Sequence, residues 1–156
     1  MLLLLDLDGV MIPTSSWRKL EILQDGFPAF SNRSIEALQK IISETSADIL
    51  LTTTHKSKHS IVEWESIFAL RGLKTNKIYK LEENLNHLSR KDEIMNWVNR
   101  TSELPNFIIL DDDKSLNDLP KFVKDNLIQT SGSVGLTDEL AMEALNVAST
   151  FTKEFA

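Results

Sequence analysis

Residues 1–10, MLLLLDLDGV, decide the fold. The leucines at 2–5 and 7 form a nearly unbroken apolar run, which is typical of a strand buried on both faces of a parallel sheet. Asp6 and Asp8 are two residues apart, so an extended chain points both carboxylates the same way, and Gly9 lets the chain turn. Ligands of open α/β sheets bind at the carboxyl ends of strands. We therefore expect a site here, although a turn with two solvated carboxylates is the alternative for this pair alone.

The rest of the chain alternates apolar runs with amphipathic stretches. Further strands are expected over residues 49–51, 77–81, 106–110 and 127–130. Helices are expected after Ser31 or Asn32, over residues 61–70 with Gly72 at the end, after Ser89, and after Thr137. This alternation predicts an α/β fold, a three-layer sandwich around a mostly parallel central sheet.

Composition sets limits on the class of protein. The length of 156 residues fits a single domain over residues 1–156. No apolar run approaches the roughly 18 residues of a membrane span, and the N-terminal leucines lack the basic residues of a signal peptide, so no membrane partner is expected. The absence of cysteine excludes thiol chemistry and fits a cytoplasmic location. The net charge of −6 argues against an extended nucleic-acid-binding surface.

Residues 11–30 form a long connection without a regular pattern. They contain Pro13, Gly26 and Pro28, and a connection of this length beside a site often contacts substrate. Trp17, Arg18 and Lys19 could contact a phosphorylated or nucleotide-like ligand, but a packed Trp with solvated charges is the favoured interpretation.

Three of the expected strands end in residues that can do chemistry. Asp6 and Asp8 follow the first, Thr52 and Thr53 the second, and residues 111–113, all Asp, follow the strand at 106–110. Clustered carboxylates repel one another unless a cation intervenes, and all-oxygen ligands suit Mg²⁺. A threonine hydroxyl can donate to a phosphoryl oxygen. The residue types therefore match phosphoryl transfer.

Two cations and two histidines need separate interpretations. Arg90 and Lys91 fall in the first turn of a helix, where a cation opposes the helix dipole, so a phosphate or the carboxylates should compensate them. His55 and His59 are spaced to share one face of a helix, but they lack the Glu of a zinc motif. We expect a pair on a helix surface rather than a metal site.

The order of these residues resembles the haloacid dehalogenase (HAD) superfamily. LLLLDLDGV looks like its first motif, ILLTT its second, RKDEI its third and FIILDDD its fourth. The resemblance implies a Rossmann-like fold with residues 11–30 as a short loop insertion in place of a cap. It also implies catalytic roles: Asp6 as nucleophile, Asp8 as general acid and base, Thr52 as phosphate ligand, and Lys91 as the third-motif base, a role that Arg90 contests. Mg²⁺ would be held by Asp6, Asp8, Asp111 and Asp112, with Asp113 a weaker candidate. Gly9, Thr53 and Arg90 would contact the substrate.

A narrower resemblance, to the HAD domain of Swiss Army Knife RNA-repair proteins, rests on RKDEIMNWV, FIILDDD and QTSGSVGLTDELAMEAL. Family members tend to have a Trp-Arg pair after the second motif, whereas this chain has Thr54-His55-Lys56. The resemblance implies a Mg²⁺-dependent phosphatase that forms an aspartyl-phosphate on a phosphomonoester. Its substrate would be a phosphorylated small molecule, a nucleotide or a nucleic-acid end. The alternative is a module of the same fold that binds Mg²⁺ and phosphate without turnover.

Overall fold

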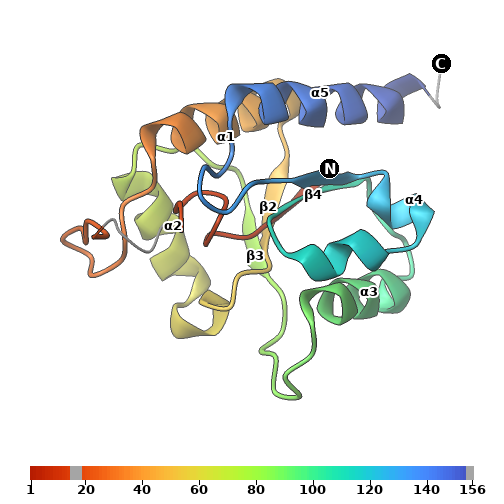
Figure 1. The fold of residues 1–156 in the computed structure, drawn as a ribbon, viewed down its shortest axis with the longest axis horizontal. Helices are drawn as coiled ribbons and strands as arrows, with labels where there is room; N and C mark the ends of the chain where they lie inside the picture. Colours follow the sequence, from red (N-terminus) through yellow and green to blue (C-terminus); the bar gives the residue numbers. More distant parts are fainter. Residues whose placement is uncertain (15–18, 154–156) are drawn as a thin grey trace.

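A single sheet of five parallel strands forms the centre of the molecule (Figure 1). The computed structural model describes residues 1–14 and 19–153; Trp17 and Arg18 lie outside these residues. The strand order is β3-β2-β1-β4-β5, which confirms the predicted α/β fold and places the N-terminal strand in the middle. The strands are β1 (Leu2–Leu5), β2 (Asp48–Leu51), β3 (Ile78–Lys80), β4 (Phe107–Asp111) and β5 (Leu127–Gln129).

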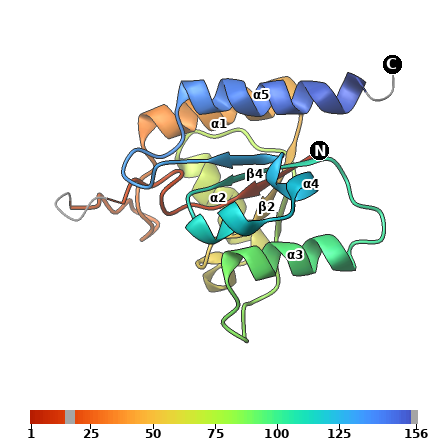
Figure 2. The same cartoon turned by 45° about the vertical axis from the view of Figure 1, so that its right-hand side comes forward.

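Helices cover both faces of the sheet and give the expected three layers (Figure 2). One face packs against α1 (Asn32–Thr45), α2 (Ile61–Leu70) and α5 (Asp138–Lys153). The other packs against α3 (Arg90–Arg100), the 3-10 helix η2 (Lys114–Asp118) and the short α4 (Lys121–Lys124). Neither η2 nor α4 was predicted from the sequence. None of the helices in the described parts of the chain is long and apolar enough to cross a bilayer.

The leucine run at the N-terminus is explained by these two cores. Side chains alternate along a strand, so Leu3 and Leu5 enter the core with α1 and α5, while Leu4 enters the core with α3. All three are fully buried. A central strand covered on both faces has no solvent-facing side, which is why its sequence does not alternate between apolar and polar residues.

Serine and threonine caps fix where the helices begin, largely as predicted. Ser31 accepts a hydrogen bond from the backbone N–H of Ser34, and Ser89 accepts one from that of Asp92. Thr137 likewise accepts from the backbone N–H of Leu140 at the start of α5. Each cap satisfies a backbone donor that the first turn leaves unpaired, and so sets the direction in which the helix leaves the sheet.

The segment between β1 and α1 contains no helix in its described residues, 11–14 and 19–30. Its second half is held against α2 by Arg71. The Arg71 guanidinium donates to the Asp25 carboxylate at 2.7 Å from Nη1, and to the carbonyl oxygens of Phe27 and Pro28, each at 2.8 Å, from Nη2. It also lies 4.9 Å from the ring centroid of Phe30. The described part of this connection is therefore fixed by a buried cation as well as by apolar packing.

Candidate active site

The register of the sheet brings the chemistry-bearing residues to one edge. β1 lies between β2 and β4, the point at which the strand order changes direction. Leu5 pairs with Leu51 on one side and with Leu110 on the other. The next residues along these strands, Asp6, Thr52 and Asp111, consequently lie side by side at the carboxyl edge, as the sequence predicts.

Three carboxylates converge at this edge. One oxygen each from Asp6, Asp111 and Asp112 lies within 4.8 Å of the others. Burial, and then the charge of Asp111, raises the pKa of Asp6 to about 8. Burial also raises the pKa values of Asp111 and Asp112. The three carboxylates repel one another when ionised, and a bound cation would offset that repulsion. Because all of the donors are oxygen atoms, which suit Mg²⁺, the residues fit such an ion.

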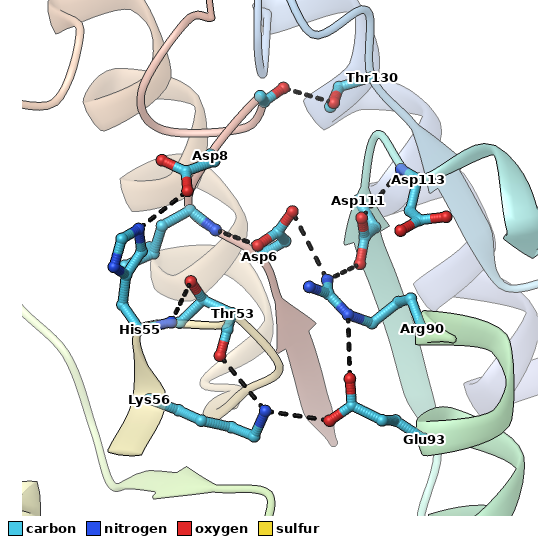
Figure 3. A network of polar contacts seen from close by, with 12 residues as sticks. Asp6, Asp8, Thr53, His55, Lys56, Arg90, Glu93, Asp111, Asp113 and Thr130 are labelled. Atoms are coloured by element: carbon cyan, nitrogen blue, oxygen red, sulfur yellow. Dashed lines mark hydrogen bonds and ion pairs between the residues drawn. The ribbon is translucent and has the colours of Figure 1, made fainter. Parts of the chain in front are cut away.

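Arg90 is the cation at this cluster (Figure 3). Its Nη1 donates to Oδ2 of Asp111 at 2.6 Å and lies 3.5 Å from Oδ2 of Asp6. Although burial lowers the pKa of Arg90, the charges of Asp111 and Asp6 raise it overall. The carboxylates therefore compensate the cation in the first turn of α3, as its position predicts.

Lys91, which the sequence favours as the third-motif base, does not pair with the carboxylates as Arg90 does in the described part of the chain. Its backbone N–H donates to Oγ of Ser115 at 3.2 Å. Within the described residues, the Lys91 side chain forms no ion pair with Asp6, Asp111 or Asp112. In this structure, Arg90 rather than Lys91 contacts the carboxylates.

A second buried cation, Lys56, is linked to Arg90 through Glu93, and the sequence did not indicate it. Lys56 is 2% exposed, and its Nζ lies 3.0 Å from Oε2 of Glu93 and 3.4 Å from the carbonyl oxygen of Thr53. The other oxygen of Glu93 is 3.7 Å from Nε of Arg90. Glu93 thus links the segment after β2 to the guanidinium at the carboxylates. A pair of buried ions separated by 37 residues leaves no local pattern in a sequence.

The two threonines after β2 differ in their partners. Thr52 is fully buried, and its hydroxyl has no hydrogen-bond partner among the described residues. The hydroxyl of Thr53 accepts from the backbone N–H of His55 at 3.2 Å. A buried hydroxyl without a partner is uncommon, and at a site it is free to bind an incoming oxygen.

Asp8 reaches the site from the other side, next to the histidine that follows the second motif (Figure 3). Its Oδ2 is 2.8 Å from Nε2 of His55. The side chain of Asp8 is 46% exposed, unlike that of Asp6. The two carboxylates of the first motif therefore have contrasting surroundings, one buried among charges and one open to solvent.

The predicted helix-surface pair of His55 and His59 is wrong. These residues flank a 3-10 helix, η1 (Lys56–Lys58), and α2 begins only after Ser60. Ser60 and Glu63 form a capping box, each bonding the backbone N–H of the other, which starts the helix at that point. The Ser-x-x-Glu spacing could have revealed this boundary.

Gly9 and Asp113 have structural roles next to the carboxylate cluster. Gly9 has φ +82°, and a Cβ at this position would overlap the carboxyl group of Asp112. Its carbonyl oxygen accepts from the Thr130 hydroxyl at 2.7 Å. Asp113 caps η2 by accepting from the Ser115 N–H at 2.8 Å, so its carboxylate is used structurally. Asp112, not Asp113, joins the three-carboxylate group.

Comparison with known proteins identifies a family for this chain. Residues 2–141 match the family described as the HAD domain in Swiss Army Knife RNA repair proteins. Comparisons with curated proteins and with solved structures gave no significant match. The matched range includes β1 to β5 and every site residue described above. The chain therefore belongs to the family of HAD domains found in Swiss Army Knife RNA repair proteins.

Proposed function

We propose that this chain is a phosphatase that hydrolyses a phosphomonoester through an aspartyl-phosphate on Asp6. The observation that carries the proposal is the pair of carboxylates after β1. Asp6 is buried beside Arg90 and Asp111, whereas Asp8 is half exposed at the mouth of the same edge. Two carboxyl groups in different surroundings can take different roles, one as nucleophile and one as proton carrier. Membership of the HAD family supports a hydrolase of this type.

In the first step, a carboxylate oxygen of Asp6 attacks the phosphorus atom in line with the leaving oxygen. The bond from phosphorus to the leaving oxygen breaks, and the Asp8 carboxyl group gives its proton to that oxygen. In the second step, Asp8, now ionised, takes a proton from water. The water oxygen attacks the same phosphorus, and the Asp6 carboxylate leaves with inorganic phosphate released.

Charge at the reacting group has to be offset by the protein. Arg90 holds Asp111 and Asp6 together, and the unpartnered hydroxyl of Thr52 can donate to a phosphoryl oxygen. Asp6, Asp111 and Asp112 would hold Mg²⁺, and the Asp8 carboxylate, which the resemblance also implies as a ligand, is not part of this group. When bound, Mg²⁺ would supply positive charge that keeps Asp6 ionised and reduces the repulsion between the Asp6 carboxylate and the phosphoryl oxygens.

The substrate we propose is a phosphorylated nucleic-acid end. The RNA-repair setting of the family supports this choice. The described part of residues 11–30 forms no helical cap, which is compatible with a large substrate at this edge of the sheet. The net charge of −6 disfavours contacts along an extended backbone, which is compatible with recognition of an end alone.

The test is Mg²⁺-dependent phosphate release over a panel of an aryl phosphate, sugar phosphates, nucleotides, and oligonucleotides phosphorylated at the 5′ or the 3′ end. Each substrate is run with the wild type and with Asp6→Asn. We expect release that needs both Mg²⁺ and Asp6, and is fastest for an oligonucleotide. Silence over the panel, with Mg²⁺ still bound, would favour the phosphate-binding module instead.

A further inference from the structure

We propose that His55 is a positioning residue that holds Asp8 in the orientation needed for proton transfer to the leaving oxygen; this rests on the proposed function. His55 stands three residues after Thr52, in the segment that follows β2. Its ring points at Asp8, with Nε2 2.8 Å from Oδ2 (Figure 3). Among the described residues, the Asp8 carboxylate forms this side-chain hydrogen bond and no other.

The neighbours of His55 decide which nitrogen carries the proton. Nζ of Lys58 lies 3.3 Å from Nδ1 of His55. A lysine ammonium group can only donate, so Nδ1 of His55 is the acceptor and Nε2 carries the ring proton. His55 consequently donates to Oδ2 of Asp8. The second oxygen of Asp8 stays free for the proton that passes to the leaving group and later comes from water.

The ring of His55 is itself fixed. The His55 backbone N–H donates to the Thr53 hydroxyl at 3.2 Å. The ring meets that of Phe27 edge to face, with centroids 5.5 Å apart, and Phe27 is held by Arg71 through its carbonyl oxygen. His55 is 24% exposed, against 46% for Asp8. An ordered donor thus holds a carboxylate that is otherwise half in solvent.

A fixed orientation matters because proton transfer requires the acid within hydrogen-bond reach of the leaving oxygen. The contribution depends on the leaving group. Dinitrophenolate leaves without a proton, whereas an alkoxide or phenolate needs one. If His55 acts through Asp8, its loss should slow the second class of substrate far more than the first.

The experiment compares His55→Ala, His55→Gln and His59→Ala on phenyl phosphate and dinitrophenyl phosphate with Mg²⁺. Gln at position 55 keeps an N–H that can donate to Asp8. His59 is the matched control, because its ring is 25% exposed and also packs on Phe27 at 5.9 Å, but it does not contact Asp8. Circular dichroism and unfolding midpoints establish that each variant is folded.

We expect His55→Ala to lower kcat/KM, which reports the step that breaks the bond to the leaving group, at least about tenfold more on phenyl phosphate than on dinitrophenyl phosphate. His55→Gln should recover part of the loss, and His59→Ala should show no dependence on the leaving group. Equal losses on both substrates, or a leaving-group effect of the same size in His59→Ala, would overturn the role of His55. An active wild type would still support the proposed phosphatase activity in that case. A wild type that releases no phosphate from either compound overturns the proposed function and the role of His55 with it.

Discussion

Arg90 donates from Nη1 to Oδ2 of Asp111 at 2.6 Å, across the gap between the first turn of α3 and the end of β4. Asp111 is fully buried, so this pair is shielded from solvent. Nη1 of Arg90 also lies 3.5 Å from Asp6. One guanidinium therefore fixes the distance between the proposed nucleophile and the acidic residue that follows β4.

Arg90→Ala should lower kcat about 100-fold, because it removes the cation from two buried carboxylates and from the phosphoryl group they would receive. Lys91→Ala should change kcat only a few-fold, since that side chain does not pair with the cluster in the described structure. Steady-state phosphate release measures both variants. A large loss in Lys91→Ala, with Arg90→Ala nearly active, would return the third-motif role to Lys91.

The metal-free protein should lose stability as the pH rises. The pKa of Asp6 is about 8 in the folded state, against an ordinary value of 3.8. The folded protein therefore holds more protons than the unfolded chain between about pH 4 and pH 8, so its free energy of unfolding falls over that window. With a chelator present, Asp6→Asn should reduce this slope. When Mg²⁺ replaces the chelator, the melting temperature of the wild type at about pH 8 should rise. Identical pH slopes in the two proteins would contradict the raised pKa.

Arg71→Ala should destabilise the fold by about 3 kcal/mol. The substitution leaves the Asp25 carboxylate and the Phe27 and Pro28 carbonyl oxygens without their donor. Arg71→Lys should lose less, since it keeps the charge but not the planar fork. Urea unfolding measures both, and a loss below about 1 kcal/mol for Arg71→Ala would show that the connection does not depend on this residue.

Lys56→Met should cost about 3 kcal/mol, because Glu93 is then buried without its lysine partner. Adding Glu93→Gln should recover part of the loss, because the side chain that lost its lysine partner is then uncharged. Lys58→Met, on the exposed side of η1, is the control and should change stability by no more than about 0.5 kcal/mol. Additive losses in the double variant would exclude a coupled pair.

Much of this arrangement could be predicted because it follows from local patterns. The leucine run marks a strand buried on both faces, and Ser31, Ser89 and Thr137 mark helix starts by their hydrogen-bonding chemistry. The site residues follow strands, so the parallel topology alone brings them to one edge.

What could not be predicted depends on contacts between distant residues. Lys56 resembles a solvated cation in the sequence, and only the fold places Glu93 against it. The choice between Arg90 and Lys91 depends on which side chain of one helical turn faces the carboxylates, and adjacent residues on a helix point in different directions. The spacing of His55 from His59 predicts a shared helix face, whereas the cap at Ser60 starts the helix later.

The measurement that tests the central claim most directly is identification of the residue that carries the phosphoryl group. Asp8→Asn is mixed with dinitrophenyl phosphate and Mg²⁺, quenched in acid, digested and analysed by peptide mass spectrometry. The first step needs no proton with this substrate, while the second lacks its base, so the intermediate should accumulate. The account predicts phosphate on Asp6 and none in the Asp6→Asn, Asp8→Asn double variant. Phosphate on another residue, or release of dinitrophenolate with Asp6 left unmodified at every time point, would contradict it.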